Sequence, residues 1–451
     1  MMLERMKYLN VALPAEIEKA KEFGDFERAE RMADLMISLE DTPECMRERL
    51  LLEKEIIRRL PLHYPYSEEE GLALIRKEIP DFTMEELHHW EDTGAADYIY
   101  INGEVRLLEL FFASMKKVYP EIAERAGADG SAGLSYLKEN IKDMKKNGRA
   151  GWHIHMKHTF RISDQAFVPG KVLVHLPVPA ACMNMKNIRI IRTEPEECIL
   201  SEASSECRTA AFIADLKENR TFSVEYEYDS EVEYKELKPE EALPCTIAEC
   251  LQEEEPQIVF TPLIRKLCAE LCGDEKNPVI LARRFYDYCT KNCTYSFTAE
   301  YMTLGNIPER FASRRKGDCG VQALLFITLC RCAGIPAQWQ SGLYVNPETT
   351  GNHDWAMFYV EPYGWCFADC SFGGAAYRAG DLERHDFYFG NLDPFRMAAN
   401  NAFQREMYPA KKHYRYDPYD NQSGECEYED HGLIYQEFES EKKIIEIHKL
   451  Y

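Results

Sequence analysis

One cysteine of the sequence stands where a catalytic nucleophile would be placed. Cys319 opens an apolar stretch of helical spacing that ends near Cys332, just before the helix-stopping Gly334. Unpaired backbone N–H groups and the helix dipole favour an anion at a helix start, so they are expected to lower the pKa of a thiol. Asp318 precedes the thiol and is expected to cap the helix. We therefore predict that Cys319 is a reactive nucleophile.

A nucleophilic thiol needs a base, and the base needs a group that orients it. His353 stands just before one strand-like run, and Asp369 ends the next. A three-residue loop at 361–363 would pair Val360 with Gly364 and would place both side chains on one face of the hairpin, as diagonal neighbours. A two-residue loop would send them to opposite faces. The order and spacing of the three residues predict a Cys-His-Asp catalytic site.

Other cysteine and histidine patterns have the residue types of metal sites. Structural zinc sites use tighter knuckles or mixed Cys/His sets than the C-x-x-x-C spacing found here. His153 and His155 lie two apart and would face the same way on a strand, but no third ligand is evident, so a polar strand face is favoured. We predict no metal and no cofactor, with a zinc protein built on the spare cysteines as an alternative. The C-x-x-x-C pairs are Cys268/Cys272, Cys289/Cys293 and Cys366/Cys370.

The elements around these residues predict an α+β chain of several domains, because 451 residues exceed one ordinary core. Residues 1–126 repeat apolar side chains every three or four positions and are predicted to be a helical domain. Residues 151–236 alternate polar and apolar types, as in an antiparallel β-sandwich-like domain. After an acidic linker, residues 258–400 are predicted to form the catalytic core. The loop-rich, aromatic segment 401–451 is predicted to be an extension that packs on this core.

Composition narrows the class of function. The net charge of −23 argues against a nucleic-acid binder, because no basic stripe offsets it. The sequence begins without an apolar core of signal-peptide length, and no run of about 18 apolar residues occurs, so neither export nor a membrane span is expected. Sixteen cysteines without a secretion signal indicate a reducing compartment. We predict a cytoplasmic protein with mostly free thiols.

The motifs around the three residues resemble a known family. GDCG…ALL…LCR…GIPAQWQSG is followed by NHDWA…Y and GWCFADCSFGG, and this succession over roughly 260–390 is similar to the transglutaminase-like superfamily. The resemblance implies a papain-like fold with Cys319 as nucleophile, His353 as base and Asp369 as the orienting carboxylate. Many relatives have Asp-Pro where this chain has Asp-Cys. The layout, with a β domain ahead of the core, also resembles bacterial multidomain members.

The resemblance further implies acyl transfer through a thioester, on a peptide or protein substrate and without a cofactor or metal. The backbone N–H of Cys319 would bind the oxyanion. The family also uses an upstream aromatic side chain for this purpose, and Tyr295 is the best-placed residue here. Aromatic residues could line the substrate cleft, although a buried core position is the alternative for each. The cleft candidates are Trp339, Trp355 and Tyr344.

Three functions stay open at this stage. Water as acceptor makes the protein a peptidase or amidase, which we favour because a cytosolic crosslinking enzyme would threaten its own cell. A primary amine as acceptor makes it a transglutaminase-type acyltransferase. A non-catalytic binding protein on the same fold is less favoured, because all three triad residues are present. The sequence does not determine the substrate, the oligomeric state or the role of the N-terminal helices.

Overall fold

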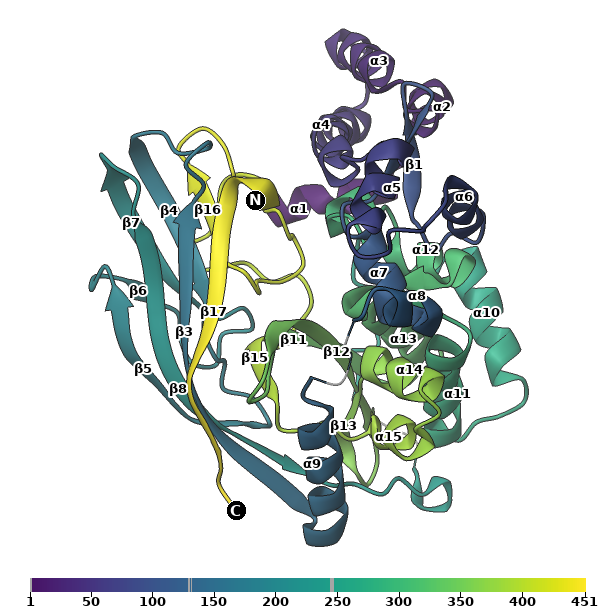
Figure 1. Ribbon diagram of the computed structural model, residues 1–451, viewed down its shortest axis with the longest axis vertical. Coiled ribbons are helices and arrows are strands. Elements are labelled where there is room, and N and C mark those ends of the chain that lie inside the picture. Colours follow the sequence, from purple (N-terminus) through teal and green to yellow (C-terminus); the bar gives the residue numbers. More distant parts are fainter. Residues whose placement is uncertain (1, 129, 131, 244–246) are drawn as a thin grey trace.

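The computed structural model describes residues 2–128, 130, 132–243 and 247–451 and shows a mixed α+β chain, as expected. Figure 1 shows a β-sandwich on the left, a core of helices and a sheet at lower right, and the N-terminal helices above that core. We keep the division into helical region, sandwich and core as a proposal about domains, because the three parts share buried surfaces.

The N-terminal region is a set of short helices with one small hairpin. Capping boxes begin two of the helices, with Ser67 and Glu70 at one start and Thr83 and Glu86 at the other. Gly24 has a φ of +73° between two helices, and a Cβ there would collide with the hairpin backbone. The elements are α1 (Met2–Met6), η1 (Lys7–Asn10), α2 (Ala15–Glu22), α3 (Phe26–Ser38), α4 (Glu44–Arg59), η2 (Leu60–His63), α5 (Glu68–Arg76), α6 (Met84–Asp92), β1 (Tyr98–Ile101), β2 (Glu104–Leu107), α7 (Phe111–Val118) and α8 (Pro120–Arg125).

One hydrophobic cluster runs through both the N-terminal helices and the core. Met115 of α7 and Leu324 of the central core helix are both fully buried members of it. A polar contact crosses the same boundary, where the backbone N–H of Phe297 donates to Ser114 Oγ at 2.9 Å. The helical region is therefore a wall of the core and not a tethered appendage.

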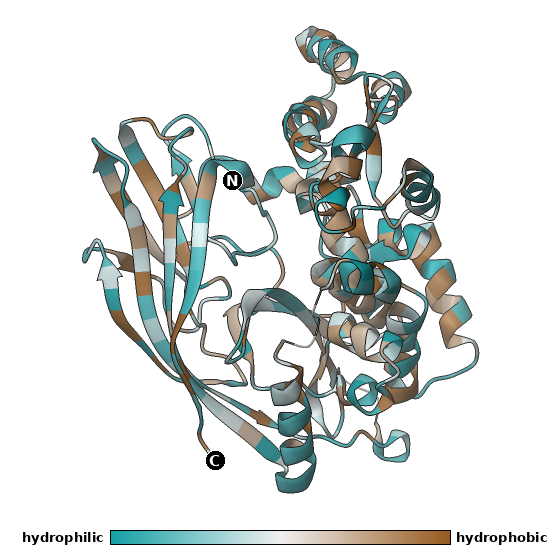
Figure 2. Cartoon of the chain, in the orientation of Figure 1, coloured by the Kyte–Doolittle hydropathy of each residue, from teal (hydrophilic) through white to brown (hydrophobic). Residues whose placement is uncertain are grey.

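The sandwich consists of two antiparallel four-stranded sheets, ordered β17-β3-β8-β5 and β16-β4-β7-β6. Along β3, buried and half-buried residues alternate, and Figure 2 shows such bands of brown and teal along the long strands. The inward rows share a second hydrophobic cluster with Trp355 and Met397 of the core sheet. The elements of this part are α9 (Leu134–Asn147), β3 (Arg149–Ile162), β4 (Gly170–Pro177), β5 (Met185–Glu194), β6 (Ile199–Leu200), β7 (Thr209–Leu216) and β8 (Thr221–Glu233).

The C-terminal segment is divided between the core and the sandwich. Its first half lies against the core, where Gln422 Nε2 donates to the carbonyl of His353 at 3.1 Å. Its second half forms β16 (Glu425–Tyr428), paired with β4, and β17 (Phe438–Lys449), paired with β3. The prediction that all of 401–451 packs on the core is therefore wrong for these strands. They cover the outer edges of β3 and β4, which would otherwise expose unpaired backbone groups.

The core is built around one buried helix, α13. Its residues from Gly320 to Arg331 are all buried, as its mostly apolar sequence predicts. It packs on β11 and β12 of a five-stranded sheet ordered β14-β13-β12-β11-β15. The elements are η3 (Pro239–Glu241), α10 (Pro262–Cys272), α11 (Pro278–Lys291), β9 (Thr294–Tyr295), η4 (Tyr301–Thr303), α12 (Ile307–Arg314), β10 (Lys316–Gly317), α13 (Cys319–Cys332), β11 (Ala337–Val345), β12 (Thr350–Val360), β13 (Gly364–Ala368), α14 (Cys370–Arg378), α15 (Leu382–Phe387), β14 (Phe389–Gly390), β15 (Arg396–Asn400) and, in the C-terminal segment, η5 (Tyr435–Glu437).

The hairpin β12–β13 has the predicted register. Val360 pairs with Gly364 and Ala356 with Ala368, so the loop has three residues. The strand then ends, and Asp369 becomes the N-cap of α14, where its side chain accepts the backbone N–H of Phe372. The predicted three-residue loop and register are confirmed. The strand pairing stops at Ala368, so Asp369 lies at the start of α14 and is not itself paired within the ladder.

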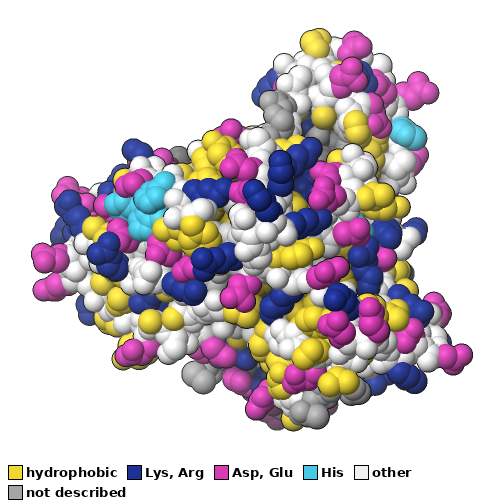
Figure 3. Space-filling view, turned by 90° about the horizontal axis from the view of Figure 1, so that it is seen from below, with side chains coloured by type: hydrophobic (Ala, Val, Ile, Leu, Met, Phe, Trp, Pro, Cys, Tyr) yellow, Lys and Arg dark blue, Asp and Glu magenta, His cyan; other side chains and the backbone are white. Residues whose placement is uncertain are grey.

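Acidic and basic side chains are intermingled on the face of the molecule that Figure 3 shows. Among the described residues, no helix is both long enough and apolar enough to cross a membrane.

Candidate active site

Cys319 is the first residue of α13 and is partly exposed. Asp318 caps the helix, as predicted, by accepting the backbone N–H of Val321 at 3.2 Å. The next residue, Gly320, has no space for a side chain, because a Cβ would lie 2.7 Å from Asp354 Oδ2 and 2.8 Å from the Trp339 ring. The helix start that carries the thiol is therefore tightly packed against Asp354 and Trp339.

His353 and Asp369 meet as the hairpin register requires. His353 Nε2 lies 2.7 Å from Asp369 Oδ2, and the same oxygen accepts Arg396 Nη2 at 2.8 Å. Arg396 is fully buried and also donates to Asp393 Oδ1 at 2.9 Å. An ionised carboxylate only accepts, so Nε2 carries the proton and Nδ1 keeps a lone pair that can take one. The arrangement presents His353 as a base.

The electrostatics of this pair follow from burial and from Arg396. Burial alone would raise the pKa of Asp369, but His353 and Arg396 outweigh it and lower that pKa to about 2. Burial lowers the pKa of His353 below its ordinary value, although Asp369 opposes the shift. At neutral pH the site therefore holds an ionised carboxylate and a neutral imidazole.

The hydrogen bond that the Cys319 thiol makes is to Asp354. Its Sγ lies 3.2 Å from Asp354 Oδ2, and the Tyr301 hydroxyl donates to Asp318 Oδ1 at 2.6 Å. Burial raises the pKa of Asp354 to about 7. Burial and the charges of Asp354 and Asp318 raise the pKa of Cys319 well above its usual range. The expectation of a lowered thiol pKa is therefore wrong for this resting arrangement, because burial, together with the two carboxyl groups, outweighs the helix start.

Tyr295 and the N-terminal helix α7 border the site. Tyr295 is buried and pairs with Gly317 in a two-residue parallel bridge, two positions before Cys319. Burial, together with the charges of Cys319 and Asp318, holds the pKa of Tyr295 well above its ordinary value. Lys117 of α7 lies with its Nζ 4.0 Å from the centre of the Tyr295 ring. The helical region thus contributes a positive charge to the site, which the sequence did not indicate.

The predicted cleft aromatics take interior positions. Trp339 and Trp355 have no exposed surface, so they form a floor beneath the site and the prediction that they contact substrate is wrong for both. Trp355 Nε1 donates to Gln340 Oε1 at 2.7 Å. Tyr344 is partly buried, and the Arg396 guanidinium lies 4.8 Å from its ring centre. These rings shape and stiffen the site from inside the core.

The other cysteine and histidine patterns have local partners. His153 Nδ1 lies 2.7 Å from Asp229 and His155 Nε2 lies 2.9 Å from Glu225, on the polar strand face that was favoured. The two sulfurs of the Cys268/Cys272 pair are 3.9 Å apart. All cysteines among the described residues are free thiols.

With this geometry in place, the chain can be compared with known proteins. A family model of the Transglutaminase-like superfamily matches residues 265–370, which include Cys319, His353 and Asp369. This region is a transglutaminase-like domain. It therefore carries the fold and the residue types of a cysteine-dependent enzyme family.

Solved structures give weaker likenesses to the same chain. A candidate cysteine protease from Cytophaga hutchinsonii is 17% identical with a TM-score of 0.41, over 66% of this chain and 91% of its own. The periplasmic domain of TgpA from Pseudomonas aeruginosa is 14% identical with a TM-score of 0.27, over 56% of this chain and 96% of its own. These scores are too low to support any functional conclusion. No curated protein matches the chain.

Three residues of the transglutaminase-like site escaped sequence reasoning. Arg396 lies outside the matched range and reaches Asp369 from strand β15. Asp354 adjoins the predicted base, but only the packing of α13 on β12 brings it to the thiol. Lys117 comes from a helix about two hundred residues earlier in the chain. Of these three, only Asp354 could have been suspected from the sequence, because it directly follows His353.

Proposed function

We propose that the protein is a cysteine peptidase or amidase that cleaves amide bonds of a peptide or protein through a thioester. The observation that supports this most strongly is the buried chain from His353 to Asp369 to Arg396. Asp369 holds one tautomer of the His353 imidazole, and Arg396 holds Asp369 in turn. The next residue of β12 after His353 is Asp354, which contacts Cys319.

The acylation step begins with the Cys319 thiol. Its proton moves to His353 Nδ1, and the sulfur attacks the carbonyl carbon of the substrate amide. The oxyanion is stabilised by the backbone N–H of Cys319, with the Tyr295 hydroxyl as the proposed second donor. His353 then gives its proton to the departing amine as the C–N bond breaks. Asp369 stabilises the imidazolium throughout and stays ionised.

Deacylation returns the enzyme to its starting state. A water molecule attacks the thioester carbonyl while His353 Nδ1 takes the proton of that water. The C–S bond breaks, the sulfur recovers a proton from His353, and a carboxylic acid leaves. A primary amine in place of water would give a transamidated product through the same steps.

Asp354 defines a resting state of the proposed enzyme. In the free protein the Cys319 thiol donates a hydrogen bond to the Asp354 carboxylate, and the raised pKa of Cys319 keeps the sulfur protonated. Catalytic hydrogen bonds often tighten only when substrate binds, so the thiol is expected to turn from Asp354 to His353 at that stage. This contact also favours the second candidate, a non-catalytic binding protein in which the thiol never leaves Asp354.

A groove lies close to the candidate site. It has a volume of about 780 Å³ and lies between the N-terminal helices and the core. Its floor includes the 296–299 segment, from which the Thr298 hydroxyl donates to Asp318 Oδ2 at 2.9 Å. Lys316, Arg310 and Asp97 also line it, so it offers both charges to a substrate. We propose that this groove receives part of the substrate chain.

The decisive experiment is intact-mass and peptide mass spectrometry on wild type and Cys319→Ala. Each protein is incubated with a mixed peptide library, with and without a primary amine. Cleaved peptides or a thioester adduct in wild type alone support cysteine acyl chemistry, and amine-capped products shift the assignment to acyltransferase. If the two proteins behave alike while both fold normally by circular dichroism, the enzyme proposal fails and the binding alternative replaces it.

We also propose that the protein works in the cytoplasm. The free state of the described cysteines supports a reducing compartment. Fractionation of the source cells tests this, and recovery outside the cytoplasm would overturn it.

A further inference from the structure

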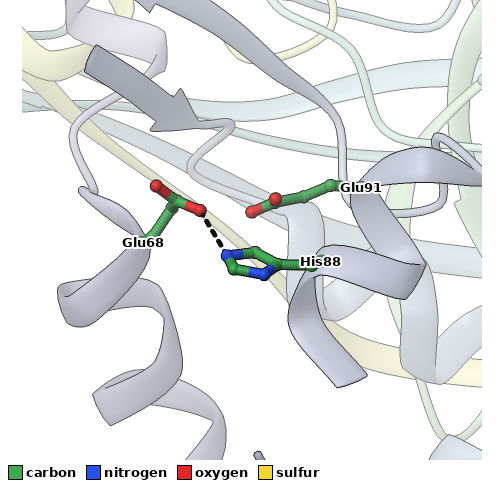
Figure 4. Close-up of side chains that lie close together, drawn as sticks. All are labelled: Glu68, His88 and Glu91. Atoms are coloured by element: carbon green, nitrogen blue, oxygen red, sulfur yellow. Dashed lines mark hydrogen bonds and ion pairs between the residues drawn. The ribbon is translucent and has the colours of Figure 1, made fainter. Parts of the chain in front are cut away.

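Three side chains of the N-terminal region converge far from the triad in sequence. Glu68 is the first residue of α5, while His88 and Glu91 lie one turn apart on α6. One ligand atom from each lies within 4.8 Å of the other two, and His88 Nε2 lies 2.8 Å from Glu68 Oε1. Figure 4 shows the Glu91 carboxylate pointing toward the other two side chains.

Glu91 is the member of this cluster that lacks a partner. Its side chain is buried, with 9% of the residue exposed, and its Oε1 has no hydrogen-bond partner among the described residues. A buried carboxylate oxygen without a donor is unfavourable, and a bound cation would satisfy it.

We propose that Glu68, His88 and Glu91 bind a divalent transition metal, with Zn²⁺ as the best fit. One imidazole nitrogen and two carboxylate oxygens suit zinc, whereas Ca²⁺ and Mg²⁺ prefer sites made of oxygen alone. Three protein ligands leave a fourth position for water, which the exposed side of His88 permits. The expectation of a protein without metal is revised by this proposal.

The supporting geometry is already fixed in the fold. Glu68 directly follows Ser67 of one capping box, and α6 starts from another at Thr83, so the starts of both ligand-bearing helices are held by side-chain-to-backbone contacts.

The structure indicates a structural clamp and not a catalytic centre. Glu91 also lines the 780 Å³ groove. Just beyond α6, the carbonyl of Thr93 accepts Lys316 Nζ at 2.5 Å, and Lys316 lies three residues before Cys319. A metal that joins α5 to α6 would therefore stiffen one wall of the groove at the point where it touches the core.

The test is Zn²⁺ titration of the full chain by calorimetry, for wild type, His88→Ala and Glu91→Gln. The matched control is His89→Ala, which removes the adjacent exposed imidazole of the same helix. We expect one zinc bound by wild type and by the control, and affinity lower by more than about tenfold in the other two variants. Thermal stabilisation by zinc should follow the same pattern. The readout is binding and stability, so it does not depend on the proposed enzymatic activity.

Free thiols are the main competitor for zinc in this chain, so cobalt serves as a second probe. Co²⁺ bound to Glu68, His88 and Glu91 should lack the thiolate charge-transfer band that a cysteine site shows. A wild-type protein that binds no zinc, or His88→Ala and Glu91→Gln variants that both bind as wild type does, would overturn the proposal. A thiolate band that survives in His88→Ala would assign the metal to the cysteines instead.

Discussion

Two histidine–carboxylate clusters in this protein differ in whether a buried arginine contacts the carboxylate. At the triad, Arg396 lies 2.8 Å from Asp369, and the pKa of that carboxyl falls to about 2. In the N-terminal cluster no arginine or lysine reaches Glu91 Oε1 among the described residues, and the pKa of Glu91 rises to about 7. Burial alone therefore does not decide whether a carboxylate is charged, because the nearest counter-charge can reverse the effect of burial. At the first site the cation is the Arg396 side chain, and at the second site we propose that it is a metal ion.

The largest effect is expected from Asp369→Asn. The amide would favour the wrong tautomer of His353, so peptide cleavage should fall by about 10³–10⁴-fold in kcat/KM. The control is Asp386→Asn, an exposed acid of the same domain whose partner is Arg283 at 2.6 Å. Equal loss in both variants would show that the effect is structural.

Without the Arg396 guanidinium, Asp369 should become a buried carboxyl without a counter-charge, as Glu91 is. Arg396→Met leaves Asp369 and Asp393 buried without their counter-charge, so the free energy of unfolding should fall by about 3–5 kcal/mol. Urea denaturation at pH 7 measures this. A loss below about 1 kcal/mol would mean that the two carboxyls are not ionised in the native protein.

The thiol should respond to its own carboxylate. Asp354→Asn removes a carboxyl group 3.2 Å from Cys319 Sγ that is about half ionised at pH 7, so the thiol pKa should fall and alkylation by iodoacetamide at pH 8, where Asp354 is mostly ionised, should accelerate about tenfold. Alkylation rates at Cys319 are measured by mass spectrometry against Asp274→Asn, an exposed acid of the same domain. An unchanged rate would exclude Asp354 as the group that restrains the thiol.

The pH dependence of stability should separate the two clusters. The folded pKa of Glu91 is about 7 and its ordinary value is 4.5, so between these pH values the folded state keeps a proton that the unfolded state loses. Stability from this group is therefore highest at low pH and declines as the pH rises through 7. Glu91→Gln should stabilise the protein at pH 8 by about 1 kcal/mol, allowing for solvent screening. Denaturation at pH 5 and pH 8 measures it, and zinc should remove the difference in wild type.

The smallest effect is expected from Lys117→Met. Loss of this charge above Tyr295 should slow alkylation of Cys319 by about threefold, opposite in sign to Asp354→Asn. Lys116→Met is the matched control, because that neighbour pairs with Glu78 at 2.7 Å. Equal rates in the two lysine variants would remove α7 from the active site.

Local rules were sufficient for the parts of the site that lie close together in sequence. The start of α13 at Cys319 follows from a capping Asp318 before an apolar run. The meeting of His353 with Asp369 follows from the parity of a three-residue loop. The same rules predicted the mixed α+β class, since helix and strand periods are visible in short windows.

By itself, then, the sequence determined the class of fold, the start of α13 at Cys319 and the meeting of His353 with Asp369, because turns, caps and strand parity act within a few residues. Only the tertiary structure decided what surrounds the triad. Arg396, Asp354 and Lys117 reach it from separate elements, and β16 and β17 close sheets that begin more than two hundred residues earlier. The raised pKa of Cys319 was also decided by the tertiary structure, because burial and the approach of charged side chains depend on which elements pack together.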